Sequence, residues 1–173
     1  MAAPQLIVFS GLPGTGKSEL AEAVGRALGI PVFAKDWMES TVKTFGRAQD
    51  ERAGEIGYGL LTTLAGRQLR LGQSAILDSV ASTLSIRAEW RALAEQYRSG
   101  FRVVECLCSD ENVHRQRLAA RRRDIPNWPE LAWSEVERVR GYYVPWGAEP
   151  RLEVDMVKPL DENLAQVLQY LQA

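Results

Sequence analysis

Residues 5–18 read Gln-Leu-Ile-Val-Phe-Ser-Gly-Leu-Pro-Gly-Thr-Gly-Lys-Ser, an apolar run followed by a glycine-rich loop. The spacing Gly11-x-x-x-x-Gly16-Lys17-Ser18 is the P-loop pattern. Glycine lacks a Cβ and tolerates positive φ, so consecutive backbone N–H groups can point into one concavity and bind phosphate oxygens. The sequence therefore predicts a phosphate-binding loop that contains Gly11, Pro13, Gly14, Thr15, Gly16, Lys17 and Ser18.

The sequence on either side of this loop tests the motif independently, because a P-loop follows a buried strand and opens a helix. Residues 6–9 are all apolar, and apolar residues at 20, 21, 24 and 28 recur at helical spacing before Gly29. We therefore expect Lys17 to reach the β and γ phosphates of a nucleotide, and the Ser18 hydroxyl to bind Mg²⁺. A glycine turn that binds no ligand is the alternative.

Composition sets the class of protein. The chain has 173 residues with 46% hydrophobic content, which fits one domain over residues 1–173. Its net charge of −1 excludes a general basic field of the kind that binds nucleic acid without sequence preference. Cys106 and Cys108 are expected to be small core residues in a reducing compartment, with redox or metal binding as the alternative.

No stretch of the sequence has the form of a signal peptide or the length of a membrane span, and we expect a cytoplasmic protein. Short apolar runs alternate with helical patterns, at residues 6–9, 30–34, 74–78, 102–108 and 152–155. This alternation predicts right-handed crossovers and a parallel sheet. The expected fold is α/β, a three-layer P-loop NTPase fold with a five-stranded parallel sheet flanked by helices and a small lid.

Several helices are predicted in more detail. Residues 40–54 lack a clear stripe and are expected to form a mobile helix or loop near the substrate. A helix from Glu55 to Gly72 is expected to turn Ile56, Leu60, Leu64 and Leu71 toward the core. Ser134 and Glu137 have the spacing of a capping box, and Asp161 is expected to cap the last helix.

Two acids follow predicted strands. Asp36 comes just after the second strand, and Asp78 ends the third. Ligands of open α/β sheets bind at the carboxyl ends of the strands, so both acids are expected at the same edge as the P-loop. Asp78 would hold Mg²⁺ through water or orient the site, and an ordinary turn residue is the alternative. Capping a helix that begins at Trp37 is the other interpretation of Asp36.

A basic segment follows the fourth strand. Arg117 and Arg121 are four residues apart, so they are expected to share a helix face and reach toward one anionic ligand. A solvated basic face is the alternative. His114 is assigned no role beyond this surface. Residues 125–129 contain two prolines that break the helix, and residues 117–133 are expected to form the lid over the nucleotide.

Together these features resemble the P-loop kinases of the adenylate-kinase group. Closest are the small ATP-binding kinases that include the polynucleotide kinase domain, zeta toxins and chloramphenicol phosphotransferase. Residues 11–18 are similar to the Gly-x-Pro-Gly-Ser-Gly-Lys-Ser loop of polynucleotide kinases, and Arg117 and Arg121 match that family's Arg-x-x-x-Arg. By this resemblance, Asp36 occupies the position of the family's catalytic aspartate. The second acid is absent, and Glu39-Ser40 and Lys43 replace the expected substrate-binding arginine.

The resemblance implies an ATP- and Mg²⁺-dependent kinase with a hydroxyl acceptor. Lys17 would bind the phosphates, Asp36 would accept the acceptor's proton, and Arg121, supported by Arg117, would stabilise charge on the transferring group. A small-molecule acceptor is favoured over a nucleic-acid 5′ end. The alternatives are a non-catalytic nucleotide-binding regulatory module and a zeta-toxin-like sugar-nucleotide kinase. A GTPase would be indicated by an Asn-Lys-x-Asp motif and by a switch glutamine after Asp78. The sequence has neither.

The acceptor is expected between residues 36–60 and the segment after Asp78. Five side chains in these segments are candidates for its pocket, although each could equally be a core or surface residue: Trp37, Tyr58, Ser79, Ser82 and Arg87.

Overall fold

The computed structural model describes residues 3–46, 52–147 and 149–172. These residues contain one parallel sheet with the strand order β2-β3-β1-β4-β5. β1, which leads into the P-loop, is therefore the central strand. The strands are β1 (Gln5–Ser10), β2 (Val32–Ala34), β3 (Ala75–Asp78), β4 (Gly100–Leu107) and β5 (Leu152–Asp155).

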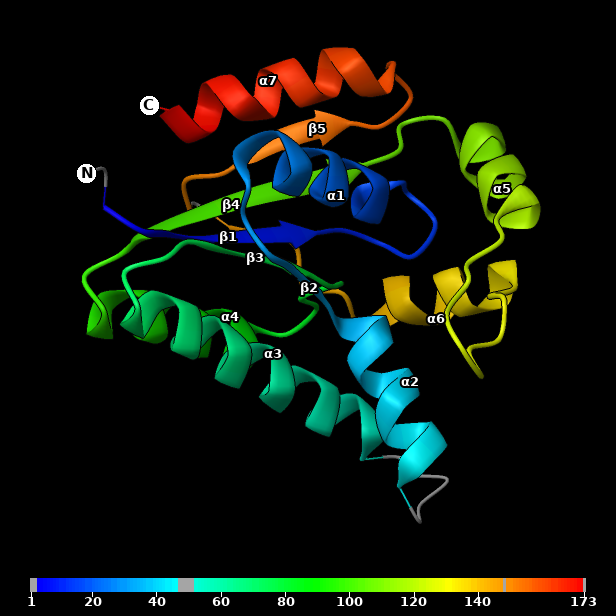
Figure 1. Cartoon of the computed structure of the whole chain (residues 1–173). Coiled ribbons are helices and arrows are strands. Elements are labelled where there is room, and N and C mark those ends of the chain that lie inside the picture. Colours follow the sequence, from blue (N-terminus) through cyan, green and yellow to red (C-terminus); the bar gives the residue numbers. More distant parts are fainter. Residues whose placement is uncertain (1–2, 47–51, 148, 173) are drawn as a thin grey trace.

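Helices cover both faces of the sheet (Figure 1). α1 (Lys17–Leu28) and α7 (Leu160–Gln172) lie on one face, and α3 (Ala53–Arg70) and α4 (Leu84–Gln96) lie on the other. Beyond the carboxyl ends of the strands lie three more helices, α2 (Lys35–Phe45), α5 (Glu111–Ala120) and α6 (Trp133–Tyr142). The predicted three-layer α/β fold is confirmed.

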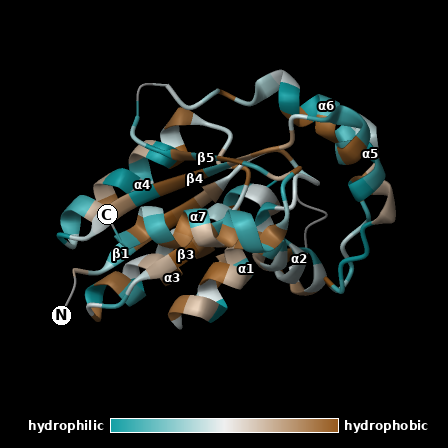
Figure 2. Ribbon diagram, turned by 90° about the horizontal axis from the view of Figure 1, so that it is seen from above, coloured by the Kyte–Doolittle hydropathy of each residue, from teal (hydrophilic) through white to brown (hydrophobic). Residues whose placement is uncertain are grey.

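The central strand joins two cores because its side chains alternate between the faces. Leu6 and Val8 pack with residues of α3 and α4 in one cluster, and Ile7 and Phe9 pack with α1 and α7 in the other. All four are fully buried. Figure 2 shows hydrophobic stretches along β3 and β4 between the helices. The carboxyl end of β1, where the P-loop begins, is consequently held from both sides of the sheet.

The predicted core face of α3 is wrong. Leu71 lies past the end of the helix, and Ile56, Leu60 and Leu71 are exposed, whereas the buried side chains come from another stripe of the helix. This stripe faces the neighbouring helices, since a Cβ added at Gly57 would lie at contact distance, 3.5 Å, from Glu39 of α2, and one at Gly66 would lie 3.4 Å from Leu93 of α4. The contacts with α2 and α4, which the local periodicity does not contain, therefore set the buried face. The buried residues are Ala53, Gly57, Leu61, Ala65, Gly66 and Leu69.

Two predicted helix starts are wrong, and so is the alternative interpretation of Asp36 as a helix cap. α2 begins at Lys35, so Asp36 lies inside its first turn and does not cap a helix that starts at Trp37. α6 begins at Trp133 after Ala132, with no capping hydrogen bond from a side chain. α7 begins at Leu160. In each case the helix starts one or more residues before the polar side chain that was expected to cap it.

The displaced capping residues make other contacts. Glu137 accepts a hydrogen bond from the Trp133 indole at 3.0 Å, and Asp161 accepts one from the backbone N–H of Glu162 at 3.0 Å. Of the segment 40–54, residues 40–45 complete α2 and residues 53–54 open α3, while residues 47–51 lie outside the described residues. The described residues of this segment are therefore mainly helical, which is one of the two forms that the sequence predicted.

The two cysteines differ in environment. Cys106 is fully buried in the β4 core, as predicted, whereas Cys108 lies beyond the end of the strand and is half-buried. Both are free thiols. Within the described ranges, none of the helices has the combination of length and apolar character that crossing a bilayer requires.

The α3 register can be tested with adjacent leucines. Leu61 is fully buried and Leu60 is 37% exposed. Leu61→Ala should lower the free energy of unfolding by about 2–5 kcal/mol because it leaves a cavity, whereas Leu60→Ala should cost less than about 1 kcal/mol. Urea denaturation followed by circular dichroism measures both, and equal losses would contradict the observed register.

Candidate active site

The P-loop adopts a conformation that requires glycine. Gly11 has φ 142° and Gly14 has φ 80°, in the region that residues with a side chain rarely occupy. A Cβ at Gly11 would lie 2.3 Å from the carbonyl oxygen of Cys106, and one at Gly14 would lie 2.8 Å from Leu118 on α5. The predicted phosphate loop is thus packed tightly between β4 and α5.

His114 supports this loop from beneath. Its side chain is buried, and its Nε2 lies 2.8 Å from the carbonyl oxygen of Pro13. Because a carbonyl only accepts, Nε2 carries the hydrogen and donates it. Burial lowers the pKa of His114, which favours this neutral form. The expectation that His114 belongs only to a basic surface is wrong, because its ring also packs edge-on against Trp133.

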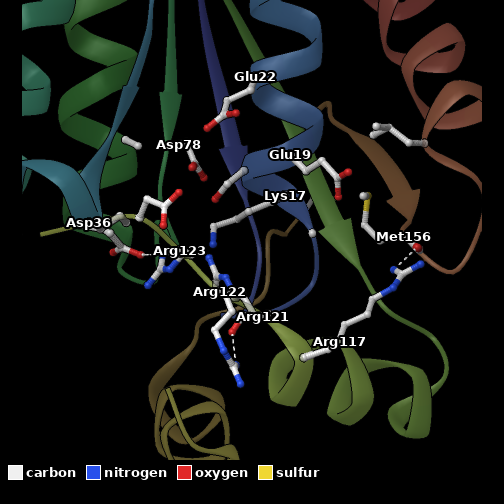
Figure 3. A pocket seen from close by; sticks show the side chains of 18 of the residues that line it. Lys17, Glu19, Glu22, Asp36, Asp78, Arg117, Arg121, Arg122, Arg123 and Met156 are labelled. Atoms are coloured by element: carbon white, nitrogen blue, oxygen red, sulfur yellow. Dashed lines mark hydrogen bonds and ion pairs between the residues drawn. The ribbon is translucent and has the colours of Figure 1, made fainter. Parts of the chain in front are cut away.

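A pocket of about 880 Å³ lies at the carboxyl edge of the sheet, in front of the P-loop (Figure 3). The sheet register explains why separate segments meet there, since Asp78 pairs with both Phe9 of β1 and Ala34 of β2. Asp36 follows two residues after Ala34. The predicted residues that line the pocket are Gly14, Gly16, Lys17, Ser18, Asp36, Asp78, Arg117 and Arg121.

Three residues of the predicted loop do not line this pocket. Gly11 and Thr15 line a smaller cavity of about 310 Å³ on the other side of the loop. Thr15 is buried and donates a hydrogen bond to the carbonyl oxygen of Leu12 at 3.1 Å, and Pro13 receives the bond from His114. Their contacts hold the loop in shape.

Asp78 is a buried carboxylate with an unused acceptor. Only 5% of the residue is exposed, and its Oδ1 has no hydrogen-bond partner among the described residues. Burial raises the pKa of Asp78, while the charge of Lys17 and the hydroxyl of Ser18 act in the opposite direction. A buried carboxylate oxygen without a partner is costly, so this atom suits a cationic ligand.

The residues present fit Mg²⁺, which commonly takes one or two protein oxygens and completes its shell with waters and substrate phosphates. The described residues contain no cluster of three or more histidine, cysteine or acidic side chains that would form a complete metal site by themselves. Ser18 and Asp78 would therefore hold Mg²⁺ together with the phosphates of a nucleotide. When bound, the ion would neutralise charge on the phosphate oxygens.

Asp36 lies in the first turn of α2 and forms an ion pair with Arg123. Burial alone would raise the pKa of this carboxyl, but the charges of Lys17 and Arg123 hold it below its usual value. Asp36 is therefore ionised at neutral pH. An ionised carboxylate at the pocket wall is chemically able to accept a proton from a bound hydroxyl.

Arg117 and Arg121 do not share a helix face, which corrects the prediction. α5 ends at Ala120, and Arg121 has extended backbone angles (φ −62°, ψ 135°) as the chain turns back toward α2. Arg117 remains on the helix and donates to the carbonyl of Met156 in the β5–α7 connection (Figure 3). Arg121 lies near Asp36 and Asp78, whose negative charges act on its pKa, although burial lowers that pKa overall.

Arg123 was not singled out by the sequence. It stands in a run of three arginines whose members look equivalent, and only the fold separates them. Arg123 pairs with Asp36, and its backbone N–H donates to Glu130 at 2.8 Å. Arg122 is exposed at the pocket rim and donates to the carbonyls of Ala119 and Arg121.

The segment 121–132, the central part of the expected lid, is attached to α2. Ser40 donates to the carbonyl of Pro126, and Asn127 donates to the Thr44 hydroxyl at 3.0 Å. With the pair formed by Arg123 and Asp36, these bonds close one side of the pocket. The contact partner of the segment in this structure is α2, and a lid over the nucleotide stays a prediction.

Among the candidates for the acceptor pocket, Trp37 lines it and is 43% exposed. Arg87 is a buried structural residue, which donates to the carbonyls of Ala81 at 2.7 Å and Pro145 at 3.3 Å. Ser79 and Ser82 are buried and do not line the pocket. Tyr58 is half-buried, and burial raises the pKa of its hydroxyl to about 12.

Comparison with known proteins places this geometry in a family. The sequence model of a family described as an AAA domain matches residues 6–141, which is well over half of the chain. The chain belongs to this AAA domain family. A UPF0200 protein of Aeropyrum pernix is similar at 28% identity over 150 residues, covering 79% of this chain and 74% of the relative.

Solved structures show the same fold. A candidate kinase from Chloroflexus aurantiacus is 25% identical with a TM-score of 0.76, covering 99% of this AAA domain chain and 98% of that one. A gluconokinase from Sinorhizobium meliloti is 21% identical with a TM-score of 0.69, covering 99% and 98%. Kti12 from Chaetomium thermophilum, in complex with ADP-AlF3, is 18% identical with a TM-score of 0.72, covering 96% and 97%.

These likenesses bear out the P-loop fold and a general relation to kinases. The closer resemblance to polynucleotide kinases, zeta toxins and chloramphenicol phosphotransferase stays a prediction.

The raised pKa of Asp78 predicts a stabilising substitution. A group whose folded pKa is raised favours folding only when protonated, and that benefit is lost as the pH rises through the folded pKa. Asp78→Asn should therefore raise the melting temperature of the nucleotide-free protein at pH 7–8. The gain should shrink as the pH falls through the folded pKa and disappear below about 4, where the carboxyl becomes protonated in the unfolded state as well.

Asp155 is the matched control of opposite sign. Hydrogen bonds from Ser109 lower its pKa, so Asp155→Asn should lower the melting temperature at neutral pH, and the loss should fade in acid. Thermal melts from about pH 2.5 to about pH 8 compare the two variants, because the contribution of Asp155 is lost only below its folded pKa, which lies under the usual value of about 4. A lower melting temperature for Asp78→Asn throughout this range would contradict the account of Asp78.

Proposed function

We propose that this protein is an ATP- and Mg²⁺-dependent kinase that transfers the γ-phosphoryl group to a hydroxyl of a small molecule. The observation that carries the proposal is one pocket lined by the P-loop lysine, an ionised carboxylate and a nearby arginine: Lys17, Asp36 and Arg121. The likeness to proteins named as kinases supports the same class of reaction. The ADP-AlF3 complex of Kti12 supports nucleotide binding by this fold.

Each residue has a defined task in the transfer. Lys17 and the loop N–H groups bind the β and γ phosphates of ATP. Asp36 accepts the hydroxyl proton of the acceptor while the new P–O bond forms and the bond between the γ phosphorus and the ADP oxygen breaks. Arg121 lines the same pocket as Lys17 and stabilises charge on the transferring group. Arg117 supports it by fixing the β5–α7 connection through Met156.

The acceptor is proposed to be small. The pocket volume of about 880 Å³ is within the range of small-molecule sites, and it must hold the nucleotide as well. The segment 121–132 closes the side next to α2 with hydrogen bonds, which leaves little width for a polynucleotide strand. A nucleic-acid 5′ end is therefore the less favoured acceptor.

Two rivals remain to be tested against this proposal. A nucleotide-binding regulatory module would bind ATP tightly without acceptor-stimulated ADP release, whereas a kinase would show such stimulation. A sugar-nucleotide kinase of the zeta-toxin type would arrest growth on expression. Assay of ADP formation against a panel of alcohols, sugar acids, nucleosides and 5′-hydroxyl oligonucleotides separates the kinase from the regulatory module.

Arg121 provides the first mutational test. Arg121→Ala should lower kcat by about 10³-fold, because the charge that it stabilises develops during transfer. The melting temperature should stay close to that of the wild type, since none of the side-chain hydrogen bonds of the described residues comes from Arg121. Arg122→Ala, which removes the neighbouring exposed guanidinium, is the control. Turnover within a few-fold of wild type for Arg121→Ala would refute its assigned role.

Asp36 provides the second mutational test. Asp36→Asn keeps the shape of the side chain but is a far weaker proton acceptor, so transfer should fall by about 10²–10⁴-fold. The affinity for AMPPNP, measured by calorimetry, should change little because the P-loop is untouched. An unfolded variant, or loss of nucleotide binding in parallel with activity, would count against the role as a base.

A further inference from the structure

We infer that the phosphoryl acceptor carries an anionic group, a carboxylate or a phosphate, and that Arg123 binds this group beside Asp36. The inference rests on the proposed function, because it describes the acceptor half of the same pocket. It concerns Arg123, which has no role in the proposed phosphoryl transfer itself.

The side chain of Arg123 has more N–H donors than it has hydrogen-bond partners among the described residues. Its side chain is 13% exposed, and one of its nitrogens, Nη1, pairs with Asp36. Nε and Nη2 are buried and have no partner among the described residues. Buried polar groups nearly always have hydrogen-bond partners, and the planar guanidinium matches an oxyanion with two parallel N–H groups. An arginine with one carboxylate and two unused donors is suited to a second anion.

The surroundings of Arg123 supply further donors and positive charge. The ring of Trp128 lies 5.7 Å from the guanidinium carbon, and the indole N–H of Trp128 is also buried and unpaired among the described residues. Lys43 of α2 places its ammonium 4.5 Å from the centre of the same ring. The contact between α2 and segment 121–132 therefore holds unused donors from two residues next to the candidate base.

An anionic acceptor is favoured because it gives Arg123 a new partner when Asp36 turns to the acceptor hydroxyl. Arg123 covers one oxygen of Asp36, and the acceptor hydroxyl must approach that carboxylate. Separating a partly buried ion pair without replacement leaves both charges uncompensated. An anionic acceptor gives the guanidinium a new partner as Asp36 turns to the hydroxyl. A neutral polyol offers no such replacement and must leave the pair intact or break it at a cost.

Arg123 also stands apart from the arginines that face the nucleotide. Arg117 is fixed on the carbonyl of Met156, and Arg121 lies near both Asp36 and Asp78 (Figure 3). Only Arg123 joins the base to the segment docked on α2. It is therefore a specificity residue for the acceptor, separate from phosphate binding at the P-loop.

Sulfate serves as the probe of this anion site. The protein is first saturated with AMPPNP and Mg²⁺ so that the P-loop is filled, and sulfate is then titrated at constant ionic strength by calorimetry and thermal shift. Wild type should bind sulfate with millimolar affinity. Arg123→Gln should weaken binding by about tenfold or more, as expected for the loss of charged hydrogen bonds. Trp128→Phe, which removes only the N–H, should weaken it by less.

Arg122→Gln is the matched control. It removes the same charge one residue away, from an exposed side chain that donates to the carbonyls of Ala119 and Arg121. Its sulfate affinity should stay within about twofold of wild type, apart from the general effect of net charge. Absence of sulfate binding to the wild type, or equal weakening by Arg122→Gln and Arg123→Gln, would overturn the inference.

Matched acceptors then test specificity. ADP formation is compared for glycerol, D-glycerate and sn-glycerol 3-phosphate, and for sorbitol and D-gluconate. At least one acid should exceed its neutral analogue by about 100-fold in kcat/KM, and Arg123→Gln should remove most of this preference. The glycerate and phosphate arms distinguish a carboxylate from a phosphate group. A neutral acceptor equal to or better than its acid would overturn the inference.

Failure of the proposed function gives a different pattern. If AMPPNP does not bind, or if no acceptor stimulates ADP formation, the kinase proposal fails. The anion site is then still decided by the comparison of Arg123→Gln with Arg122→Gln in the sulfate titration, because sulfate bound at an empty P-loop would be affected equally by the two substitutions.

Discussion

The pKa values of the two acids in the site, Asp36 and Asp78, depend on their electrostatic interaction with the positive charge of Lys17. Lys17 is buried at the start of α1, and its charge lowers the pKa of Asp36 and opposes the effect of burial on Asp78. The two carboxylates nevertheless differ, because Asp36 also has Arg123 as a partner, whereas one oxygen of Asp78 has no hydrogen-bond partner in the part of the chain that the structure describes. The pKa values of the two acids are therefore shifted in opposite directions, although the same cation acts on both.

The position of this cation is set by close packing. The P-loop passes β4 at Gly11 and α5 at Gly14 with no room for a Cβ, and His114 holds its Pro13 carbonyl from below. α5 therefore does more than carry arginines toward the pocket. Its buried face, formed by His114 and Leu118, is the floor of the loop. Replacing this floor would disturb phosphate binding without altering any residue of the motif.

The fold by itself leaves the reaction open, because P-loop folds serve many activities and function resides in the site. What narrows it here is the asymmetry of the pocket. One side has the P-loop, Ser18 and Asp78, which suit a nucleotide and Mg²⁺, and the other has Asp36 and Arg123 under the segment docked on α2. Two unlike halves facing each other suit the transfer of a group between two substrates.

The local pattern by itself determined the P-loop, the five strands and the edge of the sheet where Asp36 and Asp78 meet. Those features depend on glycine conformation, apolar runs and the geometry of parallel strands, all of which are written into short stretches of sequence. Only the tertiary structure decided which side of α3 is buried, where α5 ends and which of three adjacent arginines reaches Asp36. These outcomes depend on contacts between segments far apart in the chain, such as Gly57 against α2, whose energies no local periodicity contains.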